Sequence, residues 1–319
     1  MILRYKHLLF IIYSLLFMKI LTLTLSPAVD IEYAVGSVEL GKTSRAKSHS
    51  VSAGGKGINV SRCILNCIKN SHINTENNKI SLITIAPLGG YTGRMFSDIL
   101  SGEGIEVTTV PIKDNTRVNI SVIPMAGDEV EVNAPGTPVG EALPDLEKLV
   151  LDSICPGDVL IIAGSCPSDV KKSYPAELCK KAKDRGGLVV LDCDGEALRT
   201  AVTGETPPDL IKPNRDELSA LVGRELSTDS DVVAAAESLN GKISVITTMA
   251  GDGAYYTDSS ENGRGSKFYP TEKRKVVRLK GAGDTFLGAF VYARYGVKMN
   301  ISEAMAYASE VAGDYVAGE

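Results

Sequence analysis

Residues 279–291, Leu-Lys-Gly-Ala-Gly-Asp-Thr-Phe-Leu-Gly-Ala-Phe-Val, form the stretch around which the rest of the chain is organised. Its three small residues, Gly281, Ala282 and Gly283, allow a tight turn with uncovered backbone N–H groups, and an apolar run follows at once. Such a helix N-terminus attracts anions, because its free amides and the helix dipole converge on negative charge. Asp284 lies at the same end. Its carboxylate either caps the helix or accepts a proton from a hydroxyl while the amides hold a phosphoryl group.

The composition narrows the class of protein. A chain of 319 residues with 44% apolar residues is long enough for one large α/β domain or two smaller ones. A net charge of −5 gives no electrostatic case for nucleic-acid binding. The six cysteines include no Cys-x-x-Cys pair, so neither a zinc site nor a disulfide framework is indicated. We interpret Cys63 and Cys67 as buried free thiols, which are typical of a reducing cytoplasm.

The N-terminus carries an apolar run of 11 residues, 8–18, after two basic residues. This run is too short to span a membrane, and no small-x-small cleavage site follows it. Residues 19–25 instead have the pattern of a first core strand. We therefore expect residues 1–17 to be an upstream extension, and residues 18–319 to form a cytoplasmic protein without membrane association. A secreted or membrane-anchored protein is the alternative that the apolar run suggests.

Two polar segments with loose alternation, residues 31–52 and 116–135, are predicted to form strands of one small exposed sheet. The alternation in the second segment places Arg117 and Asn119 on one face and Val118 and Ile120 on the other. Because two separate segments build this sheet, we expect it to be a lid over the main domain.

From residue 141 onward, strands and helices alternate regularly. The strands predicted at 159–163, 188–192, 210–212 and 244–248 are nearly all apolar, as parallel strands covered on both faces must be. Open α/β sheets place ligand contacts just beyond the carboxyl ends of their strands. The residues at these ends are Gly164, Ser165, Asp192, Lys212, Pro213, Asn214 and Thr248.

Two earlier motifs suit a ligand with hydroxyl and phosphate groups. In residues 54–59, Gly-Gly-Lys-Gly-Ile-Asn, glycines let the backbone approach a ligand and a helix begins. Lys56 is suited to neutralising a phosphate and Asn59 to binding hydroxyls, although a flexible turn before a helix explains the motif equally well. Asp30, just past the first strand, is suited to bind sugar hydroxyls; the alternative is an ordinary turn residue.

Two later motifs suit a nucleotide and its metal. Asn214 and Glu217 are three residues apart and share one helix face, where a carboxylate can hold Mg²⁺ through water. This pattern is also a common helix cap. Thr248 begins a glycine turn containing Gly251 and Gly253, which either cradles nucleotide phosphates or ribose or simply forms a hairpin. The chain has no Gly-x-Gly-x-x-Gly and no Gly-x-Ser-x-Gly, which gives dinucleotide and hydrolase chemistry little support.

Taken together, these motifs resemble the ribokinase-like sugar kinases, in the branch of phosphofructokinase B, 1-phosphofructokinase and tagatose-6-phosphate kinase. The resemblance runs from about Met18 to the end of the chain. Each motif is modest alone, but all occur in the order in which the family has them. The motifs that carry it are residues 22–30, 54–59, 116–119, 131–136, 164–167, 212–217 and 281–284.

The resemblance implies a three-layer α/β/α sandwich with a mainly parallel central sheet, and a small β-sheet lid that forms a homodimer. It also implies ATP-dependent phosphorylation of a sugar phosphate, with Mg²⁺ as cofactor. Asp284 would be the catalytic base, and Gly281, Ala282 and Gly283 the anion hole. The sugar phosphate would be bound by Asp30, Gly54, Gly55, Lys56, Asn59, Arg117 and the lid residue Lys42. Nucleotide and magnesium would be bound by Lys212, Asn214, Glu217, Thr248, Gly251 and Gly253.

Within this branch the motifs favour fructose 1-phosphate as substrate, giving fructose 1,6-bisphosphate. Fructose 6-phosphate and tagatose 6-phosphate are the alternatives, because Lys42 and the residues after Asn214 look more like the 6-phosphofructokinases. Two features depart from the family: Ala250 stands where glycine is usual, which predicts a nucleotide loop shifted by one residue, and the sequence stops about one helix early. These departures suggest a different class of function, a sugar-phosphate-binding protein without turnover.

Overall fold

The structure, a computed structural model, describes residues 17–39, 41–70, 79–239, 241, 243–258 and 265–318. The expectation for residues 1–17 therefore lies outside the described residues, except at Phe17, where the first strand begins. Within the described part of the chain, no helix combines the length and the apolar character that crossing a membrane requires.

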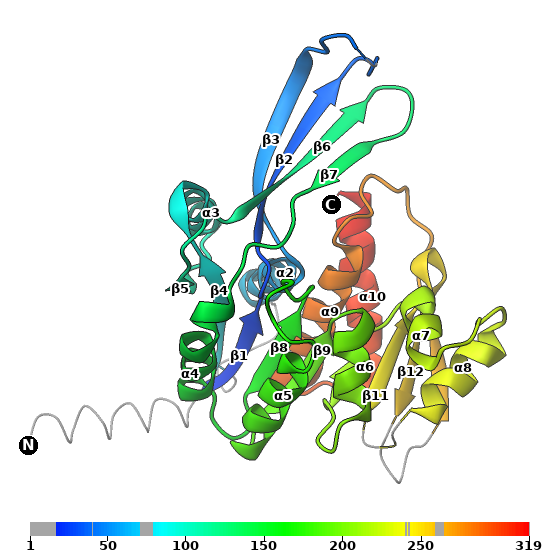
Figure 1. The fold of residues 1–319 in the computed structure, drawn as a ribbon. Helices are drawn as coiled ribbons and strands as arrows, with labels where there is room; N and C mark the ends of the chain where they lie inside the picture. Colours follow the sequence, from blue (N-terminus) through cyan, green and yellow to red (C-terminus); the bar gives the residue numbers. More distant parts are fainter. Residues whose placement is uncertain are drawn as a thin grey trace, which may run out of the picture.

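The larger sheet has nine strands in the order β13-β12-β11-β10-β9-β8-β1-β4-β5 (Figure 1). All neighbours from β5 to β11 pair in parallel, and the last two strands are antiparallel. The mainly parallel sheet expected from the apolar strands is confirmed. The strands are β1 (Phe17–Leu23), β4 (Lys79–Leu88), β5 (Val107–Pro111), β8 (Val159–Ala163), β9 (Leu188–Asp192), β10 (Leu210–Ile211), β11 (Ser244–Thr248), β12 (Gly253–Asp258) and β13 (Gly265–Pro270).

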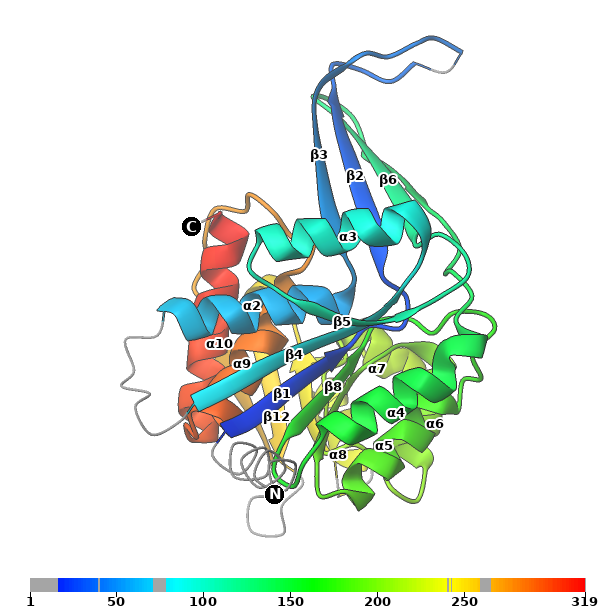
Figure 2. The same cartoon turned by 90° about the vertical axis from the view of Figure 1, so that its left-hand side faces the viewer.

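Helices cover both faces of this sheet, as Figure 2 shows. Strand β8 explains why, since all five of its residues are buried and successive side chains point to opposite faces. Leu160 and Ile162 join one apolar core, whereas Val159 and Ile161 join the other. The first core is closed by α4 (Leu143–Ser153), α5 (Tyr174–Asp184), α6 (Gly195–Thr203), α7 (Arg215–Val222) and α8 (Asp229–Ser238). The second is closed by α2 (Lys56–Asn70), α9 (Ala282–Val291) and α10 (Ile301–Ala317).

The smaller sheet projects from the main domain as the lid expected from the sequence (Figure 1). Its order is β3-β2-β6-β7, in the strands β2 (Ala28–Val35), β3 (Ala46–Gly54), β6 (Arg117–Pro124) and β7 (Val130–Asn133). Helix α3 (Gly90–Gly102) packs Phe96 and Leu100 against the root of this sheet.

The lid has two chemically different faces because its registered residues alternate. Asp30 pairs with Asn119 of β6, and Asn119 with Asn133 of β7, so one face is polar. Ile31 pairs with Ile120, and Ile120 with Val132, so the other face is apolar. Several apolar side chains of the lid are exposed to solvent: Tyr33, Ile120, Ile123, Met125, Val130 and Val132.

The secondary structure departs from the sequence-based expectation in several places. The first strand, expected at residues 19–25, is β1 at Phe17–Leu23. The sequence predicts a helix over residues 170–184, but α5 begins at Tyr174, because Pro175 is favoured in the first helical turn. The nine-residue helix α6 and strand β13 were not predicted, and each is too short for a clear periodic pattern. The last two helices, predicted over residues 283–295 and 301–316, are present as α9 and α10, but α9 ends at Val291 and passes into a π-helical turn (Tyr292–Gly296).

Candidate active site

The turn before α9 is held in shape by the last helix. Gly281 has φ 88°, a left-handed conformation that favours glycine, and a Cβ there would lie 2.8 Å from the Tyr315 hydroxyl oxygen. That hydroxyl donates a 2.8 Å hydrogen bond to the Lys280 carbonyl. The Ala282 amide is engaged with the Leu279 carbonyl at 3.1 Å. The free amides of this helix start are therefore those of the next residues in the first turn, which lack intrahelical acceptors.

Asp284 is buried in this first turn, with 8% of its surface exposed. The Asn59 amide nitrogen donates a 2.8 Å hydrogen bond to its Oδ2. Burial and the neighbouring Asp192 carboxylate raise the pKa of Asp284 to about 6, against the opposing effects of the Asn59 hydrogen bond and of Lys212 and Lys56. A carboxylate with a pKa near neutrality is well matched to accepting a proton from a substrate hydroxyl.

Asp192 is the central carboxylate of a cluster of charges that the strand ends bring together. It ends β9 and is 2% exposed. Lys56 Nζ lies 3.4 Å from its Oδ1, and Lys212 Nζ lies 3.4 Å from its Oδ2. The sequence placed Asp192 at a strand end but gave it no role; the signal available was a charged residue directly after four apolar ones.

The two lysines of this cluster lie beside the α9 turn. Lys212 is 6% exposed, and its Nζ is 3.4 Å from the position that a Cβ on Gly283 would occupy. Lys56 Nζ is also 3.8 Å from Glu217 Oε1. Burial lowers the pKa of Lys56, but the surrounding carboxylates, led by Asp192, outweigh it and leave that pKa raised. Lys56 therefore stays charged at the site.

Asp30 and the glycines before α2 meet at the base of the lid. Asn119 donates a 2.8 Å hydrogen bond to Asp30 Oδ1. A Cβ on Gly54 would lie 2.0 Å from Asp30 Oδ2, so only glycine permits this approach. Gly55 has φ 133°. Its carbonyl accepts a 3.0 Å hydrogen bond from the backbone N–H of Asn59, which starts the helix that carries Lys56.

Arg117 and Lys42, both expected to bind the substrate, have different surroundings. Arg117 donates to the carbonyls of Ala134 and Ser26 at 3.0 and 3.2 Å, and so braces the root of the lid. Burial lowers the pKa of its guanidinium. Lys42 forms an ion pair with Glu39 and is 71% exposed at its side chain. The structure of one chain does not bring Lys42 to Asp284.

We expected the sequence to contain no Gly-x-x-x-x-Gly-Lys-Ser/Thr loop, and this expectation is wrong, because the residues around Lys42 match that pattern. Residues 36–43, Gly-Ser-Val-Glu-Leu-Gly-Lys-Thr, fit the pattern Gly-x-x-x-x-Gly-Lys-Thr of phosphate-binding loops. That motif requires a strand before the loop and a helix after it. Here the residues on either side belong to the antiparallel strands β2 and β3. The match is therefore accidental, and only the structural context reveals this.

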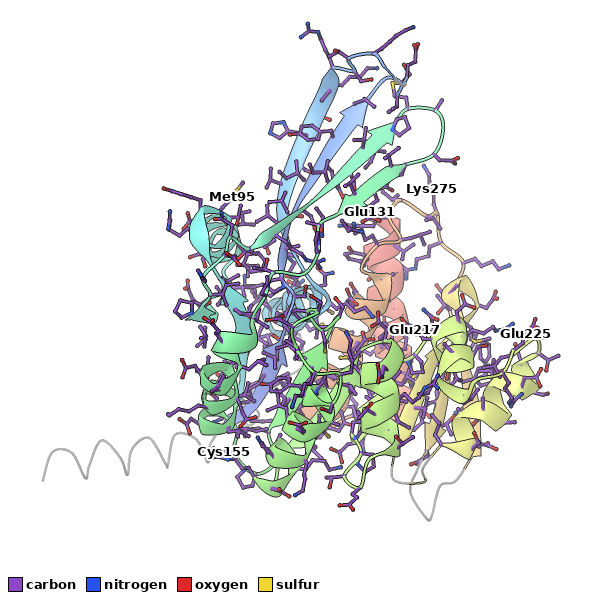
Figure 3. The ribbon with its side chains drawn as sticks, in the orientation of Figure 1. Met95, Glu131, Cys155, Glu217, Glu225 and Lys275 are labelled. Atoms are coloured by element: carbon purple, nitrogen blue, oxygen red, sulfur yellow. The ribbon has the colours of Figure 1, made fainter. Side chains whose placement is uncertain are left out.

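Asn214 and Glu217 form a reciprocal helix cap at the start of α7. Asn214 Oδ1 accepts the Glu217 amide at 2.8 Å, and Glu217 Oε2 accepts the Asn214 amide at 2.9 Å. The capping interpretation is thus realised, while Glu217 Oε1 still faces Lys56. Figure 3 shows Glu217 at the end of the main domain below the lid, and Glu131 on the lid above it.

The turn after β11 contains the glycines that the sequence suggested for the nucleotide site. Thr248 ends the strand and donates its amide to the Pro213 carbonyl at 3.1 Å. A Cβ on Gly253 would lie 2.2 Å from the Tyr269 carbonyl oxygen, whereas Gly251 has open space around it. Ala250 adopts φ 51°, the conformation that glycine adopts readily, which argues against a loop shifted by one residue.

The predicted residues thus form three groups around the carboxyl ends of the strands. Only Lys42 lies apart from all three. The charge cluster contains Asp284 with the preceding Gly281, Ala282 and Gly283, Lys56, Lys212, Asn59, and Glu217 with its capping partner Asn214; the lid base contains Asp30, Gly54, Gly55 and Arg117; the turn after β11 contains Thr248, Gly251 and Gly253.

Comparisons with known proteins agree with this arrangement. The model of the pfkB family carbohydrate kinases matches residues 24–316. The chain is 35% identical over 277 residues to the ATP-dependent 6-phosphofructokinase isozyme 2 of Escherichia coli, covering 85% of this chain and 84% of that one. It is 31% identical to the 1-phosphofructokinase of Bacillus subtilis, with the same coverage. The crystal structure of Escherichia coli phosphofructokinase-2 in complex with fructose-6-phosphate matches with a TM-score of 0.82, at 31% identity and 94% coverage of both chains.

Proposed function

Because the chain belongs to the pfkB family of carbohydrate kinases, we propose that it transfers the γ-phosphoryl group of ATP to a hexose phosphate, with fructose 1-phosphate as the preferred acceptor. The observation that carries this proposal is Asp284, a buried carboxylate with a pKa near 6 at the N-terminus of α9. A protein that only binds sugar phosphates has no need of a base poised in this way, which disfavours the non-catalytic alternative.

In this mechanism Asp284 accepts the proton of the acceptor hydroxyl as that oxygen attacks the γ-phosphorus. The amides of the first turn of α9, with Lys212 and Lys56, stabilise the negative charge on the transferring group. Asn59 holds the carboxylate of Asp284 in place through its 2.8 Å hydrogen bond. Asp30 and Asn119 bind sugar hydroxyls at the lid base, and the turn after β11 contacts the nucleotide.

The residues present fit a magnesium ion that is bound largely through water. Asp192 Oδ2 is buried and has no hydrogen-bond partner among the described residues, although Lys212 lies 3.4 Å away. Glu217 lies on the other side of Lys56. Mg²⁺ is commonly held by one or two carboxylates together with substrate phosphates, and it would neutralise phosphate charge here. Asp192, Glu217 and, through its side-chain oxygen, Asn214 are the residues that would hold it.

The choice of acceptor depends on the lid. Fructose 1-phosphate and fructose 6-phosphate carry the phosphate at opposite ends, so the position of the lid charges decides which hydroxyl faces Asp284. Fructose 6-phosphate is the second candidate, because the Escherichia coli relative named a 6-phosphofructokinase is the more identical of the two relatives compared.

The lid also supports a homodimer. The apolar side chains on one of its faces include Val130 and Val132, which are 45% and 60% exposed. Contiguous exposed apolar area of this kind usually marks an interface. A second copy of the same sheet, packed apolar face to apolar face, would cover it.

The proposed base is tested by Asp284→Asn, with Asp98→Asn on the exposed surface of α3 as the matched control. The variant should retain fructose 1-phosphate binding by calorimetry and lose kcat by roughly 10²–10⁴-fold, the range expected for a general base. The control should match the unmodified chain in both. Undiminished kcat in Asp284→Asn would refute the assignment.

A further inference from the structure

Arg62 lies one helical turn after Asn59 and connects it to a distant helix end. Its Nη1 donates a 3.1 Å hydrogen bond to Asn59 Oδ1. Its Nε and Nη2 donate to the two carboxylate oxygens of Glu103 at 2.6 and 2.9 Å. Each of the three guanidinium nitrogens therefore donates to an acceptor.

The geometry follows from two helices. Asn59 and Arg62 are three residues apart on α2, so their side chains share one helix face. Glu103 is the C-cap residue of α3, whose helix ends at Gly102. A bidentate arginine–carboxylate pair fixes the orientation of the guanidinium plane as well as its position. The end of α3 thus determines where Arg62 points.

Arg62 also determines which end of the Asn59 amide faces the catalytic carboxylate. An arginine side chain has donors but no acceptors, so it must face the amide oxygen. The amide NH₂ then points the other way, and it lies 2.8 Å from Asp284 Oδ2. The same nitrogen is 3.7 Å from the position of a Cβ on Gly281, at the turn before α9.

We propose that Arg62 is a positioning residue for the reaction: through Asn59, it holds the Asp284 carboxylate in the orientation that accepts the substrate proton. Its catalytic consequence rests on the proposed function. Arg62 touches neither of the reacting groups, and the contacts that carry the effect run from Glu103 to Arg62, to Asn59 and to Asp284.

The other groups around Asp284 set the direction of the expected effect. Asp192 at the end of β9 repels the ionised carboxylate, whereas Lys212 after β10 and Lys56 on α2 attract it. The Asn59 hydrogen bond also favours the ionised form and lowers the pKa of Asp284. Loosening Asn59 removes this contribution alone, because none of the other groups contacts Arg62. The pKa of Asp284 should then rise further.

The test compares Arg62→Met, which keeps the length of the side chain but removes its donors, with Glu103→Gln, which keeps an acceptor for Arg62. Arg224→Met, at the exposed ion pair with Asp231, is the matched control for losing a surface arginine. We expect Arg62→Met to lower kcat at pH 7 about tenfold and to move the acid limb of the kcat–pH profile upward by about half a unit to one unit. Glu103→Gln, which keeps only one of the two acceptors, should move the limb in the same direction by less, and Arg224→Met should leave it in place.

A merely structural clamp between α2 and α3 predicts a different outcome. In that case Arg62→Met and Glu103→Gln would lower the melting temperature by similar amounts, with no movement of the acid limb, and the proposal would be overturned. Titration of the Asp284 carboxyl carbon by ¹³C NMR, assigned by its loss in Asp284→Asn, provides a readout without turnover. If the unmodified chain proved inactive, the proposed function would fail, while an unshifted carboxyl titration in Arg62→Met would refute positioning independently.

Discussion

The carboxyl end of the main sheet and the lid differ in which side chains they bury, although both are built from strands. At the sheet end, charged residues are buried in contact with one another: Asp192 is 2% exposed and Lys212 is 6% exposed. In the lid, apolar residues are exposed instead, with Met125 at 75% and Val132 at 60%. Buried charges persist only when they are paired, and exposed apolar faces usually await a partner. The proposed function therefore assigns the chemistry to the first region, and the selection of the acceptor and the assembly of the dimer to the second.

The largest effect is expected from breaking the charge cluster at the sheet end. Lys212→Met removes a cation beside the α9 turn and leaves Asp192 with Lys56 as its remaining partner. We expect kcat to fall about 10²-fold and the free energy of unfolding to fall by about 1–3 kcal/mol. Steady-state kinetics and urea denaturation measure the two losses.

A second variant separates stability from activity in this cluster. Lys212→Met combined with Asp192→Asn should recover most of the lost stability, because no carboxylate remains underpaired, but it should recover no activity. If the double variant regained both, the lysine would act only as a counter-ion for Asp192.

The next effect is the pH dependence that the buried base Asp284 gives to the sheet end. With the pKa of Asp284 at about 6, kcat should fall as pH drops through 6. The folded protein also keeps a proton that the unfolded chain releases between about pH 4 and 6, so this group lowers the free energy of unfolding as pH rises through that window. Asp284→Asn should therefore be more stable than the unmodified chain above pH 6, and the two should converge near pH 4. Thermal denaturation of both proteins over that pH range measures the difference in their stability. A difference that did not change with pH would contradict the raised pKa of Asp284.

The lid should respond in assembly rather than in chemistry. Changing Val130 and Val132 together to lysine places two charges on the apolar face. We expect sedimentation to show a monomer for this variant and the proposed dimer for the unmodified chain, with little change in melting temperature measured on the isolated monomer. Glu129→Gln combined with Asp128→Asn, in the turn before β7, changes the net charge by the same two units and is the control for added charge. A dimer that survives the valine changes would exclude this face as the interface.

The smallest effect concerns Ala250, in the turn after β11, which belongs neither to the charge cluster nor to the lid. Alanine in the left-handed conformation, which Ala250 adopts, costs about 1–2 kcal/mol of stability. Glycine avoids this cost, but it gives back part of the gain because its unfolded chain has more conformational entropy. Ala250→Gly should therefore raise the free energy of unfolding by up to about 1 kcal/mol. Ala254→Gly, in the buried strand β12, should lower it instead. Denaturation of both variants checks the sign, and destabilisation by Ala250→Gly would show that the backbone there is not strained.

Much of the fold and of the site could be predicted because the governing patterns are local. The strands β8, β9 and β11 were predicted with their observed bounds, since burial on both faces makes them mostly apolar. Their polar residues are Asp192 at the end of β9 and Ser244, Thr247 and Thr248 in β11. Glycine turns and strand ends marked Lys56, Asn59, Lys212 and Asp284 as candidates, and the resemblance to the sugar kinases assigned them to one site. Helix α6 escaped prediction because nine residues contain too little periodicity.

What the sequence could not predict depends on contacts between distant segments. The pairing of Asp192 with Lys56 spans 136 residues, and the bond between Asn59 and Asp284 spans 225. The pairing of Arg62 with Glu103 likewise requires α2 and α3 to be placed first. Lys42 illustrates the opposite case. The resemblance assigned this residue to the substrate, but in the structure it forms an ion pair with Glu39 and does not lie beside Asp284.

The most direct test of the central claim is a coupled ADP-release assay on the full chain. It would supply Mg-ATP with fructose 1-phosphate, fructose 6-phosphate, tagatose 6-phosphate and free fructose in turn. The proposed function predicts rapid ADP release with a phosphorylated hexose, highest with fructose 1-phosphate, and far slower release with free fructose. Folded protein that releases no ADP with any of the three sugar phosphates, or that prefers free fructose, would contradict it.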